Sequence, residues 1–284
     1  MRAEEMHVVM NLATYEDLWK RGEELLWFVE QGYERILQKL PRRADKVILY
    51  GSPVGKISNR QFIFNEKNWA RFRKELREGK LGYFALSLWL ECRDNPERVA
   101  PYGAGIHIYT YPDYPGHASI LMLGAERPFY GEQPLDAWQE EWVDLACEAF
   151  VRFHGATGFI IVDASSWREP SSPYEGEARV IGAEYHFRSK VRGYYWGNFL
   201  SREHIERLGG LEAVLREAPC YLVRDLSDGE DWRAYLQLTA KMEDVPEEAL
   251  RALRDYLRPL LPGPERLPPW DPHYGRYRHV LYGE

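Results

Sequence analysis

The sequence predicts an α+β fold in which about four main helices pack on largely antiparallel sheet. Three observations lead to this prediction. Several short runs alternate apolar and polar residues, as half-buried strands do. The links between successive runs are too short for the crossover that a parallel pair of strands requires. Four longer segments repeat apolar residues at intervals of three and four, which is typical of helices with one buried face.

Two helices are expected in the first third of the chain. One covers residues 15–40, with Thr14 as its N-cap and Pro41 as its stop. The other is capped by Asn65 and extends to residue 78, before a glycine. Strands are expected at residues 7–12, 46–50, 61–64, 81–92, 105–111 and 118–123.

The middle of the chain contains one long helix and one irregular segment. The helix is expected over residues 134–154 and is followed by a strand at residues 159–162. Residues 165–176 are rich in proline and serine, which indicates a domain boundary or a loop. A further strand is expected at residues 178–187.

The last third of the chain contains residues that are typical of the starts and ends of helices and strands. The Trp196-Gly197-Asn198 step favours a tight turn. Ser201 is expected to cap a short helix that ends at a Gly-Gly pair. The elements expected after it are a helix at residues 211–217, strands at residues 220–223 and 234–239, and a helix that begins near Asp244 and ends near residue 260.

This order suggests three parts. They are an N-terminal half over residues 1–164, a C-terminal half over residues 177–262, and an extended aromatic tail over residues 263–284 that docks on the body. Both halves run helix, paired strands, helix, which indicates a pseudo-duplicated architecture without a residue-level repeat. One continuous domain is the alternative.

Composition narrows the class of protein. The chain has 284 residues, with 37 Lys and Arg against 44 Asp and Glu, a formal net charge of −7. Direct nucleic-acid binding by bulk positive charge is therefore not expected. No stretch is apolar for long enough to span a membrane or form a signal peptide, so a cytoplasmic protein is expected. Cys92, Cys147 and Cys220 form no close pair and are expected to be buried, reduced thiols.

Catalytic signatures are missing from the sequence. Residues 51–58 approach a phosphate-binding loop, but the glycine spacing is wrong and a proline interrupts it. His107, Asp163 and His186 are the candidates for a metal-dependent hydrolase or nuclease, an alternative that requires distant positions to converge. No cofactor and no metal are expected, and the protein is not expected to be an enzyme.

Two groups of residues are candidates for binding a partner protein. The first is an acidic cluster, which can complement a basic surface. The second is an aromatic run, which belongs either to the core or to an exposed anchor. The candidate residues are Asp225, Asp228, Glu230 and Asp231 in the cluster and Tyr194, Tyr195 and Trp196 in the run.

Residues 190–262 resemble the immunity proteins of bacterial type VI secretion systems and polymorphic toxins. The matching pieces are Trp196-Gly197-Asn198, Leu208-Gly209-Gly210, Pro219-Cys220, Leu236-Gln237-Leu238-Thr239 and Leu260-Leu261-Pro262. The resemblance implies a non-catalytic cytoplasmic protein, a monomer or homodimer, that binds a cognate toxin or effector in bacterial conflict or defence and blocks it. A structural or scaffolding component of a defence or phage system is another alternative.

Overall fold

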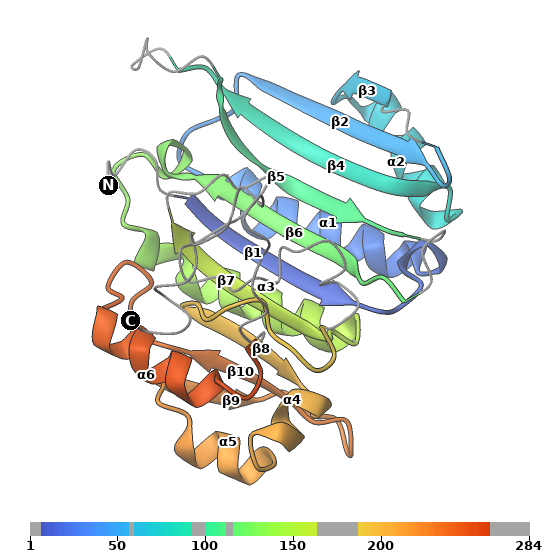
Figure 1. Cartoon of the computed structure of the whole chain (residues 1–284). Helices are drawn as coiled ribbons and strands as arrows, with labels where there is room; N and C mark the ends of the chain where they lie inside the picture. Colours follow the sequence, from blue (N-terminus) through green and yellow to red (C-terminus); the bar gives the residue numbers. More distant parts are fainter. Residues whose placement is uncertain (1–6, 57–59, 93–99, 112–115, 164–186, 262–284) are drawn as a thin grey trace, which may run out of the picture.

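One antiparallel sheet organises the molecule. The computed structural model describes residues 7–56, 60–92, 100–111, 116–163 and 187–261. Within them, ten strands form a single sheet in the order β3-β2-β4-β5-β6-β1-β7-β8-β10-β9 (Figure 1). The strands are β1 (His7–Thr14), β2 (Lys46–Pro53), β3 (Arg60–Ile63), β4 (Leu81–Leu90), β5 (Tyr102–Tyr109), β6 (Ser119–Glu126), β7 (Thr157–Asp163), β8 (Gly197–Ser201), β9 (Leu222–Asp225) and β10 (Arg233–Gln237).

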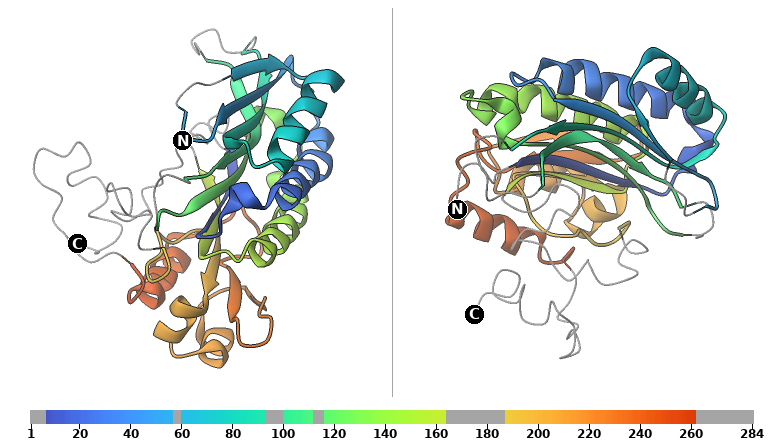
Figure 2. Two further views of the ribbon diagram at one scale, coloured as in Figure 1. Left: turned by 90° about the vertical axis from the view of Figure 1, so that its right-hand side faces the viewer. Right: turned by 90° about the horizontal axis from the view of Figure 1, so that it is seen from above.

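Helices cover both faces of this sheet unequally. The helices are α1 (Gly22–Arg35), α2 (Glu66–Arg77), α3 (Gln139–Arg152), α4 (Arg202–Arg207), α5 (Leu211–Glu217) and α6 (Glu247–Leu257). Helices α1, α2 and α3 lie side by side on one face, whereas α6 lies on the opposite side near the C-terminal strands (Figure 2). The α+β prediction is confirmed. None of the helices in the described ranges combines the length and the apolar character that crossing a bilayer needs.

Strand β1 shows how the sheet divides the core. Its alternate residues Val8, Met10 and Leu12 belong to the main core, with the residues of α1 and α3. Val9 and Ala13 belong to two smaller clusters on the other face. Because side chains alternate along a strand, Asn11 lies on that second face as well.

Ion pairs connect the three helices of the covered face. Glu30 of α1 lies 2.8 Å from Arg73 of α2, and Arg35 of α1 lies 2.9 Å from Glu148 of α3. Gly22 opens α1 where a Cβ would approach the backbone of α2 to 2.4 Å. The glycine is therefore required by the close packing of two helices.

The two predicted halves share the sheet. Strand β7 pairs with β8 from Thr157↔Leu200 to Ile160↔Gly197, and α3 covers this seam, where Phe150 and Phe199 have ring centroids 5.0 Å apart. The boundary segment at residues 165–176, residues 178–186 of the strand expected at residues 178–187, and the whole of the expected tail at residues 263–284 lie outside the described residues.

The expected helix over residues 15–40 is wrong at both ends. The Oγ1 atom of Thr14 donates a hydrogen bond to the Phe153 carbonyl at 2.7 Å and accepts one from the backbone N–H of Glu16 at 3.1 Å. These bonds end β1 in a turn, so Thr14 caps no helix. Short 3₁₀ turns at Leu18–Lys20 and Leu37–Lys39 flank a shorter α1.

The expected turn at Gly197 is a strand instead. Gly197 begins β8 and pairs with Gln237 of β10. A Cβ on this glycine would lie 3.1 Å from both Ile160 and Tyr235. Close packing between neighbouring strands therefore explains the glycine, and no left-handed backbone is involved.

Candidate functional site

The acidic cluster lies on the hairpin between β9 and β10. Residues 226–232 form the connection, in which Asp228 and Asp231 form an isolated bridge around Gly229, whose φ is +60°. Glycine adopts this left-handed conformation at little cost. The tight turn carries the neighbouring carboxylates outward at the free edge of the sheet.

The four carboxylates of this hairpin have different surroundings. Asp231 forms an ion pair with Arg233, whose side chain is 4% exposed. Asp225 accepts a hydrogen bond from the backbone N–H of Ser227 at 2.9 Å. Asp228 and Glu230 are exposed, and their carboxylates form no ion pair with any residue that the structure describes. These two side chains are the part of the cluster that can meet a partner directly.

Arg233 connects the hairpin to the end of α3. Its Nη2 atom donates to Nδ1 of His154 at 3.1 Å, and His154 follows α3 with a φ of +47°. A buried cation near a helix C-terminus is stabilised by the helix dipole. Asp231 and Arg233 therefore hold the base of the hairpin, and Asp228 and Glu230 form its tip.

The predicted aromatic run is packed inside the protein. Tyr194, Tyr195 and Trp196 are each at most 3% exposed. Trp196 donates from Nε1 to the Thr239 carbonyl at 3.2 Å, and Tyr195 stacks on Phe159 with ring centroids 4.2 Å apart. In this conformation they belong to the core and do not form an exposed anchor.

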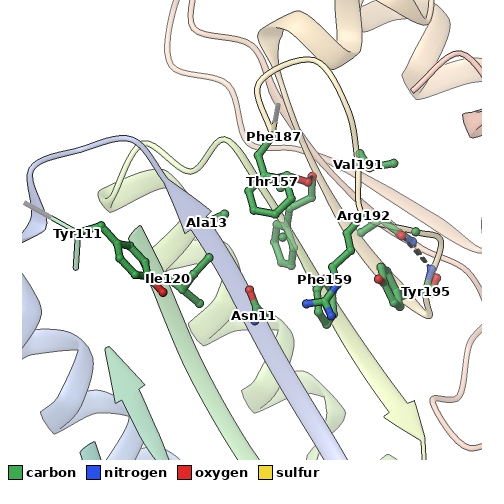
Figure 3. A pocket seen from close by; sticks show the side chains of 14 residues that line it. Asn11, Ala13, Tyr111, Ile120, Thr157, Phe159, Phe187, Val191, Arg192 and Tyr195 are labelled. Carbon is green, nitrogen blue, oxygen red and sulfur yellow. Dashed lines mark hydrogen bonds between the residues drawn. The ribbon is translucent and has the colours of Figure 1, made fainter. Parts of the chain in front are cut away.

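A pocket lies on the second face of the sheet, across β1, β7 and β8 (Figure 3). Its volume is about 170 Å³. Asn198 fixes one side, because its carboxamide accepts from the Tyr195 N–H at 2.9 Å and donates to the Tyr195 carbonyl at 2.8 Å. Described residues on its walls include Asn11, Phe159, Phe187 and Arg192.

This pocket is not predicted from the sequence. Asn11 was the available signal, because it is a polar residue with low strand propensity inside an apolar run. Arg192 gave no signal, since a single arginine near aromatic residues is common. Only the tertiary pairing of β1 with β7 and of β7 with β8 brings these residues together.

The candidate metal residues do not converge. His107 on β5 and Asp163 on β7 are separated by β6 and β1. Across these strands the residue of β7 in register with His107 is Phe159, and Asp163 lies four residues further along β7. With strands about 4.8 Å apart and about 3.4 Å per residue, the two backbone positions are roughly 20 Å apart. His186 lies outside the described residues. In the described part of the chain, no three His, Cys, Asp or Glu side chains are grouped so that they could hold a metal ion.

The three cysteines are free thiols. Cys147 is buried as expected, while Cys92 and Cys220 are only partly buried. Burial raises the pKa of the Cys147 and Cys220 thiols to about 12. Both thiols are therefore protonated at neutral pH and are poor nucleophiles.

Comparison with known proteins relates the fold to that of a solved structure. No protein-family model matches the sequence, and no curated protein matches it. Among solved structures, the fold is similar to that of a T6SS protein of Pseudomonas aeruginosa, with a TM-score of 0.57 and 13% sequence identity. The match covers 90% of this chain and 73% of the other. At this identity the likeness establishes a shared fold.

Proposed function

We propose that the chain is a non-catalytic immunity-type protein that binds a cognate toxin or effector protein and blocks it. The observation that carries this proposal is the fold shared with a T6SS protein over 90% of the chain. The resemblance of residues 190–262 to immunity proteins supports it independently, because it rests on sequence pieces. The described residues of those pieces extend from Trp196, just before β8, to Leu261, just after α6.

The hairpin tip offers a contact that suits such a role. Asp228 and Glu230 extend from a short turn whose base is held by the Asp231–Arg233 ion pair. Exposed charges of one sign accelerate association with a partner of the opposite sign. A toxin with a basic surface around its active site fits this tip.

Co-expression tests the function directly. The product of each gene that flanks the gene of this chain is tested as the effector by producing it in a bacterial host with and without the chain, and growth is followed. We expect toxicity from the effector alone, rescue by the chain, and a stable complex by size-exclusion chromatography. Toxicity that persists despite folded chain, together with separate elution of the two proteins, would contradict the proposal.

Charge reversal at the tip tests the contact. We expect Asp228→Lys with Glu230→Lys to slow association with the effector about tenfold at low salt, with a smaller effect on dissociation. The difference should shrink as salt screens the charges. Surface plasmon resonance at several salt concentrations measures both rates.

A matched control separates local charge from net charge. Glu34 on α1 and Glu132 are exposed, and reversing both changes the net charge of −7 by the same amount. Glu34→Lys with Glu132→Lys should leave the association rate nearly unchanged. Equal slowing by both double variants would show that the hairpin tip makes no specific contact.

A further inference from the structure

Asn11 is an unusual residue in its strand. Strand β1 is buried along its whole length, and Asn11 is 9% exposed between the register partners Met122 and Phe159. Among the residues that the structure describes, none hydrogen-bonds to the Asn11 carboxamide. Its amide atoms are not among the fully buried polar atoms that lack a partner, so the carboxamide is open to a partner that enters from outside the protein.

The carboxamide faces the pocket described above. Asn11 is one of its lining residues, and Figure 3 shows its side chain at the edge of the hollow, with Phe159 beyond it. The volume of about 170 Å³ exceeds the roughly 150 Å³ of an apolar cavity known to admit benzene. A single planar ring with one small substituent therefore fits.

The polar side chains that line the pocket indicate the kind of substituent that it accepts. Arg192 carries the only formal charge among the described lining residues, and its guanidinium lies 5.8 Å from the centroid of the Phe159 ring. In Figure 3 this side chain extends over Phe159 toward β1, where Asn11 lies. A guanidinium has five N–H donors and a carboxamide has two. This combination suits the two oxygens of a carboxylate.

We propose that the pocket binds a carboxylate attached to a ring-sized planar group. In this arrangement the Asn11 carboxamide and the Arg192 guanidinium donate hydrogen bonds to the carboxylate oxygens, and the stacked Phe159–Tyr195 pair flanks the ring. A free aromatic acid has both parts of this chemistry, and the acidic residue of a bound protein shares its carboxylate. The site does not depend on the immunity role.

Titration with benzoate tests the proposal on the full-length protein. Chemical shifts in ¹⁵N-labelled protein should change saturably at Asn11, Phe159 and Tyr195, with a millimolar dissociation constant. Benzylamine, which has a ring of the same size and the opposite charge, should produce no such change. Absence of saturable shifts with benzoate, or equal binding of benzylamine, overturns the proposal.

Asn11→Leu separates binding from structure. Leucine retains the volume but removes the amide, so benzoate affinity should fall about tenfold or more, as expected for loss of a hydrogen bond to a charged group. The melting temperature should stay equal or rise, because a buried polar group without a protein partner is replaced by an apolar one. Unchanged affinity, or a markedly lower melting temperature, contradicts the assignment.

Met122→Leu is the matched control. Met122 pairs with Asn11 on the same face, and it is not among the lining residues. This volume-conserving change should leave benzoate affinity unchanged. A tenfold loss in this variant would show that the effect of Asn11→Leu is indirect, and it would overturn the proposal.

The complex with the effector distinguishes the two sources of the carboxylate. If a partner residue occupies the pocket, Asn11→Leu weakens the complex and benzoate competes with it. If a free acid is the ligand, benzoate binds as expected and the complex is unaffected. Failure of the effector to bind at all would end the immunity proposal and leave the benzoate result intact.

Discussion

At the scale of single residues, His204 has the clearest chemical consequence. It lies fully buried on α4, where its Nδ1 atom accepts a hydrogen bond from the backbone N–H of Ser201 at 3.3 Å. Burial lowers the pKa of His204 to about 4, because the charged form loses its hydration. In the unfolded chain the same side chain has its ordinary pKa of about 6.5.

This difference makes the stability of the protein dependent on pH. The unfolded state takes up a proton below about pH 6.5, whereas the folded state does so only near pH 4. The contribution is therefore complete above pH 6.5, is lost progressively as the pH falls toward 4, and is constant below that. Between pH 7.5 and 5, His204 alone should lower the free energy of unfolding by about 2 kcal/mol.

His204→Gln tests this prediction. Glutamine is a preferred side chain at this position of a capping box and does not titrate. Urea unfolding at pH 7.5 and 5 should show a pH-dependent loss in the variant that is smaller by about 2 kcal/mol. Identical pH dependence in the wild type and His204→Gln would contradict the assigned pKa.

The role of a residue can be predicted from the sequence when its hydrogen-bond partners lie within the same turn. Asn65 and Ser201 were recognisable as caps because their side chains bond within the next turn. Threonine is also common at N-caps, but the Thr14 hydroxyl donates its hydrogen bond to the Phe153 carbonyl, far along the chain. Asn11 and Arg192 share a pocket only after three strands have paired. Sequence spacing contains no record of such contacts.

At the scale of elements, α2 stabilises the edge of the sheet. Strand β3 is an edge strand that pairs with β2 alone. Arg60 of β3 donates to Glu75 of α2 at 2.6 Å, and Phe62 packs edge-on against Phe72 with centroids 5.9 Å apart. A helix docked in this way holds a short edge strand that would otherwise fray.

The N-cap of α2 should matter for stability. The Oδ1 atom of Asn65 accepts from the backbone N–H of Asn68 at 2.9 Å. Asn65→Ala should lower the free energy of unfolding by about 1 kcal/mol, because this N–H loses its partner. Asn65→Asp retains an acceptor and should cost much less. Urea titrations compare the two, and equal losses would show that the cap contributes little.

Helices and strands were predicted correctly where the residues at their ends are typical of element boundaries. The helix expected at residues 211–217 has those bounds in the structure, since a Gly-Gly pair and a proline enclose it. The helix expected at residues 15–40 was too long, because leucines in flanking 3₁₀ turns continue the helical period. Strand β8 was missed, because its glycine and asparagine are typical of turns and only neighbouring strands make it a strand.

At the scale of the whole molecule, two of the connections between the described parts of the halves bear on how the protein folds. One is the seam between β7 and β8, where Phe199 packs between Phe150 of α3 and Tyr235 of β10, with centroids 5.0 and 4.8 Å away. The other lies near the start of α3, where Gln139 donates to the Ala240 carbonyl at 2.8 Å and accepts from the Met242 N–H at 3.2 Å. At these two places the halves are therefore in direct contact.

These connections predict one cooperative folding unit. Hydrogen exchange in the full chain should give β5, β6 and β10 the same free energy of opening, because the sheet and α3 join them into one core. Phe199→Ala should lower that shared value by about 3–5 kcal/mol, as expected when a fully buried aromatic ring is removed. If β10 instead opens at a much lower free energy than β5 and β6 in the wild type, the two halves are separate units. The sheet would then be continuous in its hydrogen bonds without being cooperative across the seam.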